Sequence, residues 1–173
     1  MIDGDIDAFG ILVRKYEKQV ASVIYNMVGP VAEAEDIGQE VFIRFFKVIR
    51  RFRGDAAVST YLTRIAINLS LNALKKRKHR RRWVADITDD DLQMLAEENE
   101  DQMKFDTDIL QQALALLEPK FRAVVVLRFI EGFSTRETAA ILRLPQGTVL
   151  SRLSRGQDKL KEILMPFREV FFE

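Results

Sequence analysis

Apolar residues recur every three or four positions through most of this chain, which is the spacing of α-helices that bury one face. The first such run begins at Asp7, a residue type that caps helices, and stops at Gly29-Pro30. A second run covers about residues 32–52 and a third about residues 59–82, separated by the turn-forming Arg53-Gly54-Asp55. The positions expected to face a core are Phe9, Leu12, Val13, Tyr16, Val20, Val23, Ile24 and Met27 in the first run, Ile37, Val41, Phe42, Phe45, Phe46, Val48, Ile49 and Phe52 in the second, and Leu62, Ile65, Ala66, Leu69 and Ala73 in the third.

Two shorter helical patterns lie on either side of a proline in the C-terminal part of the chain. Pro145 cannot lie inside a helix, and it disfavours helical dihedrals at Leu144. The first helix should therefore end near Arg143, and the second should begin with Pro145 in its first turn. Ser134 or Thr135 can cap the first helix. The pattern predicts two helices joined by a tight turn.

The faces of these two helices predict a helix-turn-helix that reads DNA. Val149, Leu153 and Leu160 share one apolar face of the second helix, and Ala139 with Ala140 provides a small surface where the two helices can cross. The opposite face is polar, and a recognition helix presents such residues to base edges and phosphates. It consists of Gln146, Thr148, Ser151, Arg152, Arg155 and Lys159. A surface helical hairpin with a solvated face is the alternative interpretation.

Composition favours an all-α protein with one or two small domains. The chain has 173 residues, of which 47% are hydrophobic and 31% charged, and it contains almost no alternating strand-like segments. It has no cysteine, which excludes disulfides and thiolate zinc sites and is typical of a reducing compartment. No apolar run approaches the roughly 18 residues of a membrane span, and nothing resembles a signal peptide. We therefore expect a cytoplasmic protein without membrane insertion.

The net charge of +1 conceals a strong segregation of charge along the chain. Residues 1–85 carry 16 Lys and Arg against 9 Asp and Glu, residues 86–108 carry 1 against 10, and residues 109–173 carry 10 against 7. A basic, acidic, basic order is expected when two nucleic-acid-binding modules flank a solvated connector. The sequence thus predicts two small helical domains, 1–85 and 109–173, joined by an acidic linker over 86–108.

The third helical run ends in a dense basic segment, Lys75 to Arg82, with seven positive charges in eight positions. A phosphate backbone would relieve the repulsion between them, while an anionic membrane surface and plain solvation remain alternatives. Upstream, Tyr61, Arg64, Asn68 and Asn72 follow one another at helical spacing and could stack on or hydrogen-bond to unpaired bases. His79, the single histidine, has no cysteine nearby and is read as part of the solvated basic face.

Three segments together resemble bacterial sigma factors of the extracytoplasmic-function group. They are Ala34 to Phe42 (AEDIGQEVF), Phe52 to Asn68 (FRGDAAVSTYLTRIAIN), and Leu117 to Arg128 (LEPKFRAVVVLR) followed by Gly132-Phe133-Ser134 and the helix-turn-helix. The resemblance covers roughly residues 7–165 in the family's order and spacing. It implies a protein that binds core RNA polymerase and directs promoter-specific initiation of transcription.

The resemblance also implies roles for particular residues. The first segment would bind the coiled coil of the largest polymerase subunit, through Asp36, Gln39, Glu40 and Arg44. The loop and third helix would open and read the −10 element, with a base splayed into a pocket of the Arg53–Thr60 loop, through Arg53, Asp55, Ser59, Thr60, Tyr61, Arg64, Asn68, Asn72, Lys75 and Lys76. The polar face of the helix-turn-helix would read the −35 element in duplex DNA. An anti-sigma protein is the further partner that the resemblance implies, and no catalytic, cofactor or metal residue is expected.

Several positions depart from the family pattern. Tyr61 stands where the family usually has tryptophan, which preserves an aromatic face. Leu150 and Gln157 replace arginines, and Gly156 replaces an alanine, which weakens a helix by about 1 kcal/mol. We therefore expect weaker binding by the C-terminal domain and a shallower salt dependence.

Two other classes of function compete with this interpretation. A free-standing helix-turn-helix regulator would explain residues 109–165 but would leave the Asp36-Gln39-Glu40 band and the third helix without a role. An enzyme could hold Mg²⁺ on the carboxylates Asp89, Asp90, Asp91, Glu97 and Glu98, but these lie in the expected linker, and metal sites need rigid convergence. The chain also lacks a phosphate-binding glycine loop and the common hydrolase motifs, so we expect that it is not an enzyme.

Overall fold

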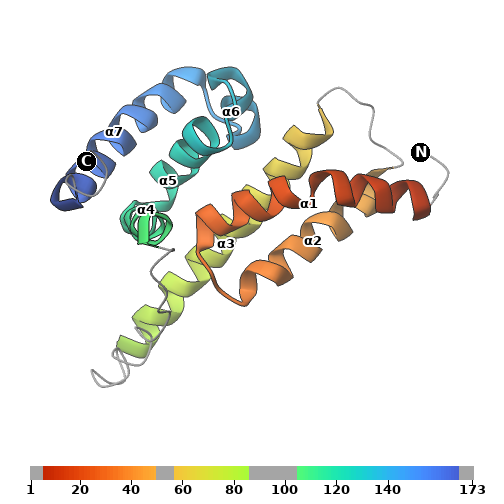
Figure 1. The fold of residues 1–173 in the computed structure, drawn as a ribbon, viewed down its shortest axis with the longest axis horizontal. Helices are drawn as coiled ribbons and strands as arrows, with labels where there is room; N and C mark the ends of the chain where they lie inside the picture. Colours follow the sequence, from red (N-terminus) through yellow and green to blue (C-terminus); the bar gives the residue numbers. More distant parts are fainter. Residues whose placement is uncertain (1–5, 50–56, 86–104, 168–173) are drawn as a thin grey trace.

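The computed structural model describes residues 6–49, 57–85 and 105–167, and within these ranges the secondary structure is entirely helical. The elements are α1 (Ile6–Val28), α2 (Glu33–Val48), α3 (Val58–Ala85), α4 (Phe105–Leu116), α5 (Pro119–Val125), the π-helical turn η2 (Val126–Ile130), α6 (Thr135–Leu142), α7 (Gln146–Leu164) and the short 3₁₀ turn η3 (Met165–Phe167). They form two groups, α1–α3 and α4–α7, that lie side by side (Figure 1). The all-α class is confirmed.

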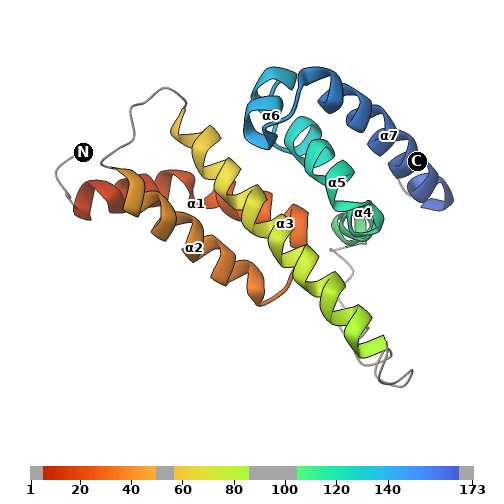
Figure 2. The ribbon, with the colours of Figure 1, turned by 180° about the vertical axis from the view of Figure 1, so that it is seen from behind.

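The first group is a three-helix unit in which α1 packs against both α2 and α3. Gly29, with a φ of 83°, ends α1 in a left-handed conformation that glycine adopts without strain. The apolar stripes meet in the centre, where Val23, Ile24, Val41, Phe45 and Leu62 have almost no exposed surface. The C-terminal part of α3, which carries the basic segment, extends beyond both groups (Figure 2).

The second group wraps around α5. Pro119 lies in the first turn of α5, where a missing N–H costs nothing. The helix then continues into η2, whose wider turn is closed by the Glu131 N–H donating to the Val126 carbonyl oxygen at 2.9 Å. α7 packs along α5 and lies on the side of this group away from α1 and α2 (Figures 1 and 2).

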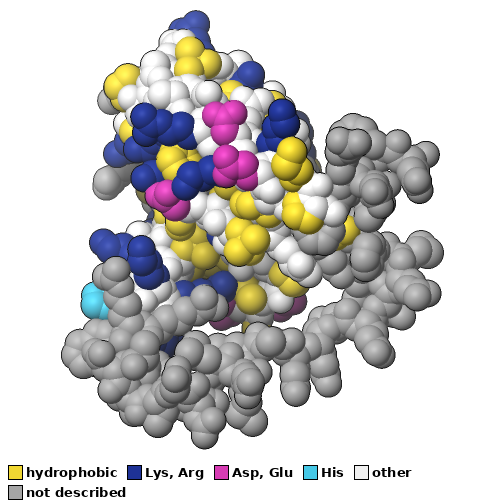
Figure 3. Space-filling model, turned by 90° about the vertical axis from the view of Figure 1, so that its left-hand side faces the viewer, with side chains coloured by type: hydrophobic (Ala, Val, Ile, Leu, Met, Phe, Trp, Pro, Cys, Tyr) yellow, Lys and Arg dark blue, Asp and Glu magenta, His cyan; other side chains and the backbone are white. Residues whose placement is uncertain are grey.

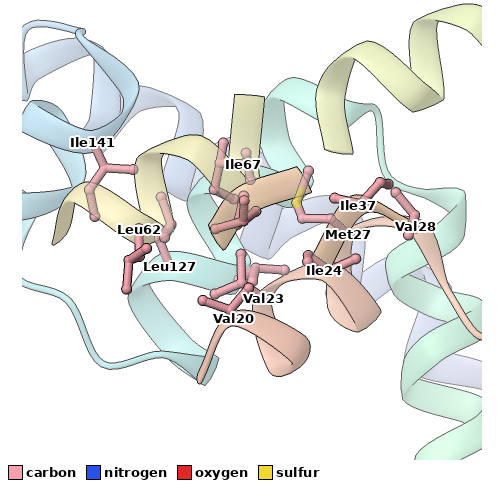
Figure 4. Close-up of a cluster of buried hydrophobic side chains, with 14 of the residues drawn as sticks. Val20, Val23, Ile24, Met27, Val28, Ile37, Leu62, Ile67, Leu127 and Ile141 are labelled. Atoms are coloured by element: carbon pink, nitrogen blue, oxygen red, sulfur yellow. The ribbon is translucent and has the colours of Figure 1, made fainter. Parts of the chain in front are cut away.

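One hydrophobic core runs through both groups. Leu62 of α3 lies beside Leu127 of η2 and Ile141 of α6, and all three belong to the same cluster as Val20 and Met27 of α1 (Figure 4). A polar contact accompanies this core, because the Gln111 side chain donates to Asn26 Oδ1 at 2.6 Å. The two halves of the chain therefore pack against each other instead of standing apart.

The structure differs from the sequence analysis in a few places. Phe46, expected to widen the buried stripe of α2, is 42% exposed, with its ring edge-on to that of Phe9 at a centroid distance of 4.8 Å. Ala140 is exposed, so of the two alanines only Ala139 is buried in α6. Residues 105–108, which the sequence analysis counted with the linker, belong to α4. The remaining linker residues and Phe52 lie outside the described residues.

Candidate nucleic-acid and partner interfaces

The first helix of the helix-turn-helix is α6, and its start is defined by a capping box. Ser134 Oγ accepts a hydrogen bond from the Glu137 N–H at 3.2 Å, and the Ser134 N–H donates to Glu137 Oε2 at 2.8 Å. The Ser134 hydroxyl also donates to the same carboxylate at 2.6 Å. The hydrogen bond from the Ser134 hydroxyl, followed by that from its backbone N–H, lowers the pKa of Glu137. Ser134 is therefore the cap, as the sequence predicted as one of two choices.

The turn between the helices lies where Pro145 was expected to place it. α6 ends at Leu142, and the N–H groups of Arg143 and Leu144 both donate to the Ala139 carbonyl oxygen. α7 starts at Gln146, and the Pro145 carbonyl oxygen accepts its first hydrogen bonds from the N–H groups of Thr148 and Val149, at 3.0 and 3.1 Å. Arg143 itself has a left-handed backbone, with a φ of 54°.

α7 is held against α5 at a point that sequence reasoning interpreted differently. Gly156 is buried, and a Cβ added there would come within 2.9 Å of Val125 Cγ2. The glycine is thus required by the close approach of α7 to α5, in addition to its effect on helix propensity. In the sequence, glycine in place of the family's alanine marks this position as unusual. Only the tertiary structure shows that Val125 is the residue that α7 contacts here.

The six residues predicted for −35 recognition lie on α7 as expected, with different environments. Gln146, Ser151, Arg155 and Lys159 are exposed, whereas Thr148 and Arg152 are half-buried. Lys159 is engaged within the fold, because its Nζ donates to Glu118 Oε1 at 3.1 Å and lies 5.2 Å from the centre of the Phe121 ring. Hydrogen bonds from Lys120 and then Lys159 lower the pKa of Glu118. Lys159 therefore helps to hold α7 to α5.

The residues predicted for −10 recognition follow α3. Asn68, Asn72, Lys75 and Lys76 are exposed, Ser59, Tyr61 and Arg64 are half-buried, and Thr60 is 7% exposed. Arg53 and Asp55 lie outside the described residues. Arg64 Nη2 donates to the Ala140 carbonyl oxygen of α6 at 3.0 Å, across the boundary between the two groups. In this arrangement Arg64 is therefore bound to the helix-turn-helix.

The basic residues at the end of α3 fall into two sets, one bonded within the fold and the other exposed to solvent. Arg77 donates to Glu33 Oε2 at 2.9 and 3.0 Å and to the Val28 carbonyl oxygen at 3.1 Å, so it joins α3 to the end of α1. Lys75, Lys76, Lys78, His79 and Arg80 are exposed. Figure 3 shows Lys and Arg side chains gathered beside the histidine on this part of the surface. The exposed members form a basic surface for an anionic ligand.

The predicted polymerase-binding residues form a band on α2. Asp36, Gln39 and Arg44 are exposed, and Arg44 Nε donates to Glu40 Oε1 at 2.7 Å. This hydrogen bond is the main reason why the pKa of Glu40 is lowered. An open cleft of about 800 Å³ between α2 and α3 is lined by Asp36, Glu40 and Arg44 on one side and by Asn72, Lys75, Lys76, His79 and Arg80 on the other. The fold thus brings three of the four predicted polymerase-binding residues and three of the predicted −10 residues, Asn72, Lys75 and Lys76, to the same cleft.

The described helices offer no membrane-crossing or metal-binding feature. None combines the length and apolarity that a bilayer span requires. Within the described ranges, no three His, Asp or Glu side chains come together as a metal site would need. The carboxylates at residues 89–91, 97 and 98 lie outside those ranges.

Comparison with known proteins identifies the class. The family model for sigma-70 region 2 matches residues 12–80, and that for sigma-70 region 4 matches residues 107–160. Together these models cover most of α1–α3 and most of α4–α7, so the two groups of helices correspond to the two regions of a sigma-70 protein.

Individual relatives narrow this class. The chain is 35% identical over 170 residues to the ECF RNA polymerase sigma factor SigW of Bacillus subtilis, covering 93% of this chain and 91% of the relative. It is 33% identical over 173 residues to the RNA polymerase sigma-H factor of Pseudomonas aeruginosa, covering 94% and 89%. The fold is shared with the sigma factor RpoE of Bartonella quintana, solved in complex with the anti-sigma factor NepR, with a TM-score of 0.73 at 21% identity over 91% of this chain and 97% of that one. The chain belongs to the extracytoplasmic-function sigma factors of RNA polymerase.

Proposed function

We propose that this chain binds core RNA polymerase through α2 and directs initiation at promoters by contacting the −10 element with α3 and the −35 element with α7. The observation that carries the proposal is the α2–α3 cleft, where Glu40 and Arg44 face Asn72 and Lys75. A subunit that must hold polymerase and promoter at once needs these two surfaces side by side. A free-standing regulator would need the helix-turn-helix alone.

On the polymerase side, the proposed contacts are Asp36, Gln39, Glu40 and Arg44. Three of them are exposed, and the side chain of Glu40 is 40% exposed. The Glu40–Arg44 pair lies on consecutive turns of α2, which holds the carboxylate in one orientation without burying it. A partner helix can therefore dock on this band without any rearrangement of the core.

On the −10 side, α3 offers an exposed track of Asn68, Asn72, Lys75 and Lys76. The amides suit base edges, and the ammonium groups suit phosphates. Tyr61 lies near the start of the same helix, with its ring centre 5.7 Å from that of Phe45. Melting would draw on the binding energy of the unpaired strand, with bases stacked on an aromatic surface, so no hydrolytic or other catalytic group is required.

The packing of the two regions places a condition on promoter binding. Arg64 cannot turn its whole guanidinium towards DNA while Nη2 donates to the Ala140 carbonyl oxygen. The polar face of α7 has no such restriction, because Gln146, Ser151 and Arg155 are exposed. Full engagement of the promoter would therefore require α3 and α6 to separate, a change that polymerase binding on α2 would accompany.

An anti-sigma protein is the additional partner that we propose. One chain of the same fold was solved with the anti-sigma factor NepR, and another, CnrH, with the cytosolic domain of CnrY. Beside the polymerase-binding band, Ile43 and Phe46 on α2 are 47% and 42% exposed. A competitor that covers these apolar residues would also cover α2. Purification from the native host with no accompanying protein at any growth condition would argue against this partner.

The proposed function is tested by transcription in vitro on a fragment library of the host genome. Core polymerase is used alone and with this chain, and the 5′ ends of the RNA are mapped. New starts that share paired upstream elements about two helical turns apart are expected. An absence of new starts, together with salt-sensitive binding to particular duplex sites, would support the free-standing regulator instead. The proposed role also places the chain in the cytoplasm, where polymerase and chromosome are found.

A further inference from the structure

Arg143 occupies the turn of the helix-turn-helix in a backbone conformation that arginine seldom adopts. Its φ and ψ are 54° and 48°, and the other positive φ values among the described residues belong to Gly29 and Gly132. In this left-handed region a Cβ approaches the following carbonyl oxygen, which costs folding free energy for every residue except glycine and, to a lesser extent, asparagine and aspartate. The backbone therefore disfavours arginine at this position.

The surrounding turn imposes that conformation. The Ala139 carbonyl oxygen accepts from the N–H groups of both Arg143 and Leu144, the latter at 3.0 Å. α7 begins at Gln146, where the Pro145 carbonyl oxygen accepts the first hydrogen bonds of the new helix. The chain must leave α6 and enter α7 within three residues, and a left-handed residue makes this reversal possible.

The fold makes no use of the Arg143 side chain. The residue is exposed, and its guanidinium forms no hydrogen bond or ion pair with any residue that the structure describes. Its neighbours on the turn are equally open, because Pro145 and Gln146 are exposed. A side chain that destabilises the turn and contributes no contact is best explained by a ligand outside the chain.

The surroundings indicate an anionic ligand. Arg143 precedes the end of α7 that would enter the major groove, three residues before Gln146. Between Gln146 and Arg152 α7 carries no other cation, and Arg152 is half-buried. This end of the recognition helix therefore depends on Arg143 for an exposed positive charge. A guanidinium can donate two parallel hydrogen bonds to phosphate oxygens, which fixes position as well as adding affinity.

We propose that Arg143 contacts a DNA backbone phosphate beside the −35 element and sets the register of α7 in the groove. The inference rests on the proposed function and adds a positioning residue to it. A phosphate contact carries no sequence information, so its loss should weaken binding to all promoters alike.

The test uses the full chain with core polymerase on promoters mapped in the transcription experiment. Arg143→Gly removes both the charge and the backbone strain, Arg143→Gln removes the charge and keeps the strain, and Arg143→Lys keeps both. Both neutral variants should lower promoter affinity by roughly tenfold. The slope of log affinity against log salt should become shallower by about 0.9 in each. Arg143→Lys should retain most of the affinity.

Melting temperature separates the two effects of the residue. Arg143→Gly should melt roughly 2–4 °C higher than the natural chain, while Arg143→Gln should not. The matched control is Lys161→Gln, which removes one exposed cation from the last turn of α7 and should leave promoter affinity nearly unchanged. A variant that is more stable and binds DNA less well would show that the strain is retained for binding.

Unchanged affinity and salt slope in a folded Arg143→Gly variant would overturn the proposal. A loss confined to one promoter sequence would also overturn it, because that result would make Arg143 a base-reading residue. Both results presuppose that the natural chain directs new transcription starts. If it directs none, the proposed function itself fails, and the two failures are thereby distinguished.

Discussion

Arg122 of α5 and Met27 of α1, 95 positions apart, are joined by a hydrogen bond of 2.5 Å from the guanidinium Nη1 to the carbonyl oxygen. Nη2 of the same guanidinium donates to the Ala115 and Leu117 carbonyl oxygens at 2.5 and 3.1 Å. Burial, and then the charge of Arg77, lowers the pKa of Arg122. One side chain thus donates hydrogen bonds both to a carbonyl group at the end of a region 2 helix and to carbonyl groups at the α4–α5 connection of region 4.

The first prediction concerns this contact. Arg122→Met should destabilise the protein by about 3 kcal/mol, because three carbonyl groups would lose their donor in a site that is 6% exposed. Chemical unfolding measures the loss, and small-angle scattering should show a larger radius as the two regions separate. Arg136→Met, at an exposed position of α6, is the control and should change stability by less than about 0.5 kcal/mol. Equal stability of the two variants would mean that these hydrogen bonds make no net contribution.

A second prediction concerns pH. The Ser22 hydroxyl donates to Glu131 Oε1 at 2.6 Å across the same interface. Burial raises the pKa of Glu131 above its ordinary value of 4.5, and the hydrogen bond from Ser22 opposes this shift only in part. Ionisation of Glu131 therefore disfavours the folded state. The contribution of this group to the free energy of unfolding rises as pH falls through the raised pKa, and it is fully present below pH 4.5.

Glu131→Gln removes this ionisation and keeps an acceptor for Ser22. The variant should be more stable than the natural chain at pH 7.5 by no more than about 0.5 kcal/mol. The difference should shrink towards zero as pH is lowered to 4. Urea unfolding at both pH values measures it, and a difference that grows on acidification would contradict the assigned sign.

A third prediction concerns the crossing of α7 and α5. Gly156→Ala gains helix propensity but brings a methyl group within 2.9 Å of Val125 Cγ2 in a packed site, so we expect a net loss of about 1 kcal/mol. Gly147→Ala is the matched control, because the added Cβ would meet nothing within 4 Å in the same helix and should stabilise by roughly 0.5 kcal/mol. Thermal unfolding compares the two. Gly156→Ala combined with Val125→Ala should lose less stability than the sum of the single changes, since the second substitution removes the clash.

A fourth prediction concerns the α2 band. Gln39→Ala with Glu40→Ala should weaken binding to core polymerase by about tenfold or more, as expected when central interface residues are truncated. Stability should change little, because the Glu40–Arg44 pair is exposed and solvent screens the attraction between its charges. Fluorescence anisotropy with purified core polymerase measures the affinity, and Lys18→Ala on α1 serves as an exposed control. Unchanged affinity in the double variant would remove the proposed role from these residues.

Sequence reasoning succeeded where the controlling interactions are local. The periodicity of apolar residues located α1, α2 and α3, and Pro145 located the break between α6 and α7. The Ser134 cap was also accessible, because a capping box joins residues three positions apart. These features depend on hydrogen bonds and steric limits within a few residues, which the order of amino acids displays directly.

The same reasoning was wrong about Phe46. An apolar residue on the flank of a helix is buried only if a neighbouring element covers it, and periodicity cannot say how far the neighbours extend. Phe46 packs against the ring of Phe9, but 42% of its surface remains exposed. The width of a buried stripe is thus a property of the packed helices and not of the helix alone.

By itself the sequence determined an all-helical chain with a helix-turn-helix, a polar band on the second helix and a basic third helix, because these follow from short-range patterns. Only the tertiary structure decided that both regions share one core, that Arg64 is bound to Ala140 and that Gly156 is required by Val125. Each of these pairs joins residues far apart in sequence, 76 positions in the case of Arg64 and Ala140. Such contacts are selected by the complementary shapes of packed surfaces and by the need to satisfy buried carbonyl groups, which no local pattern records.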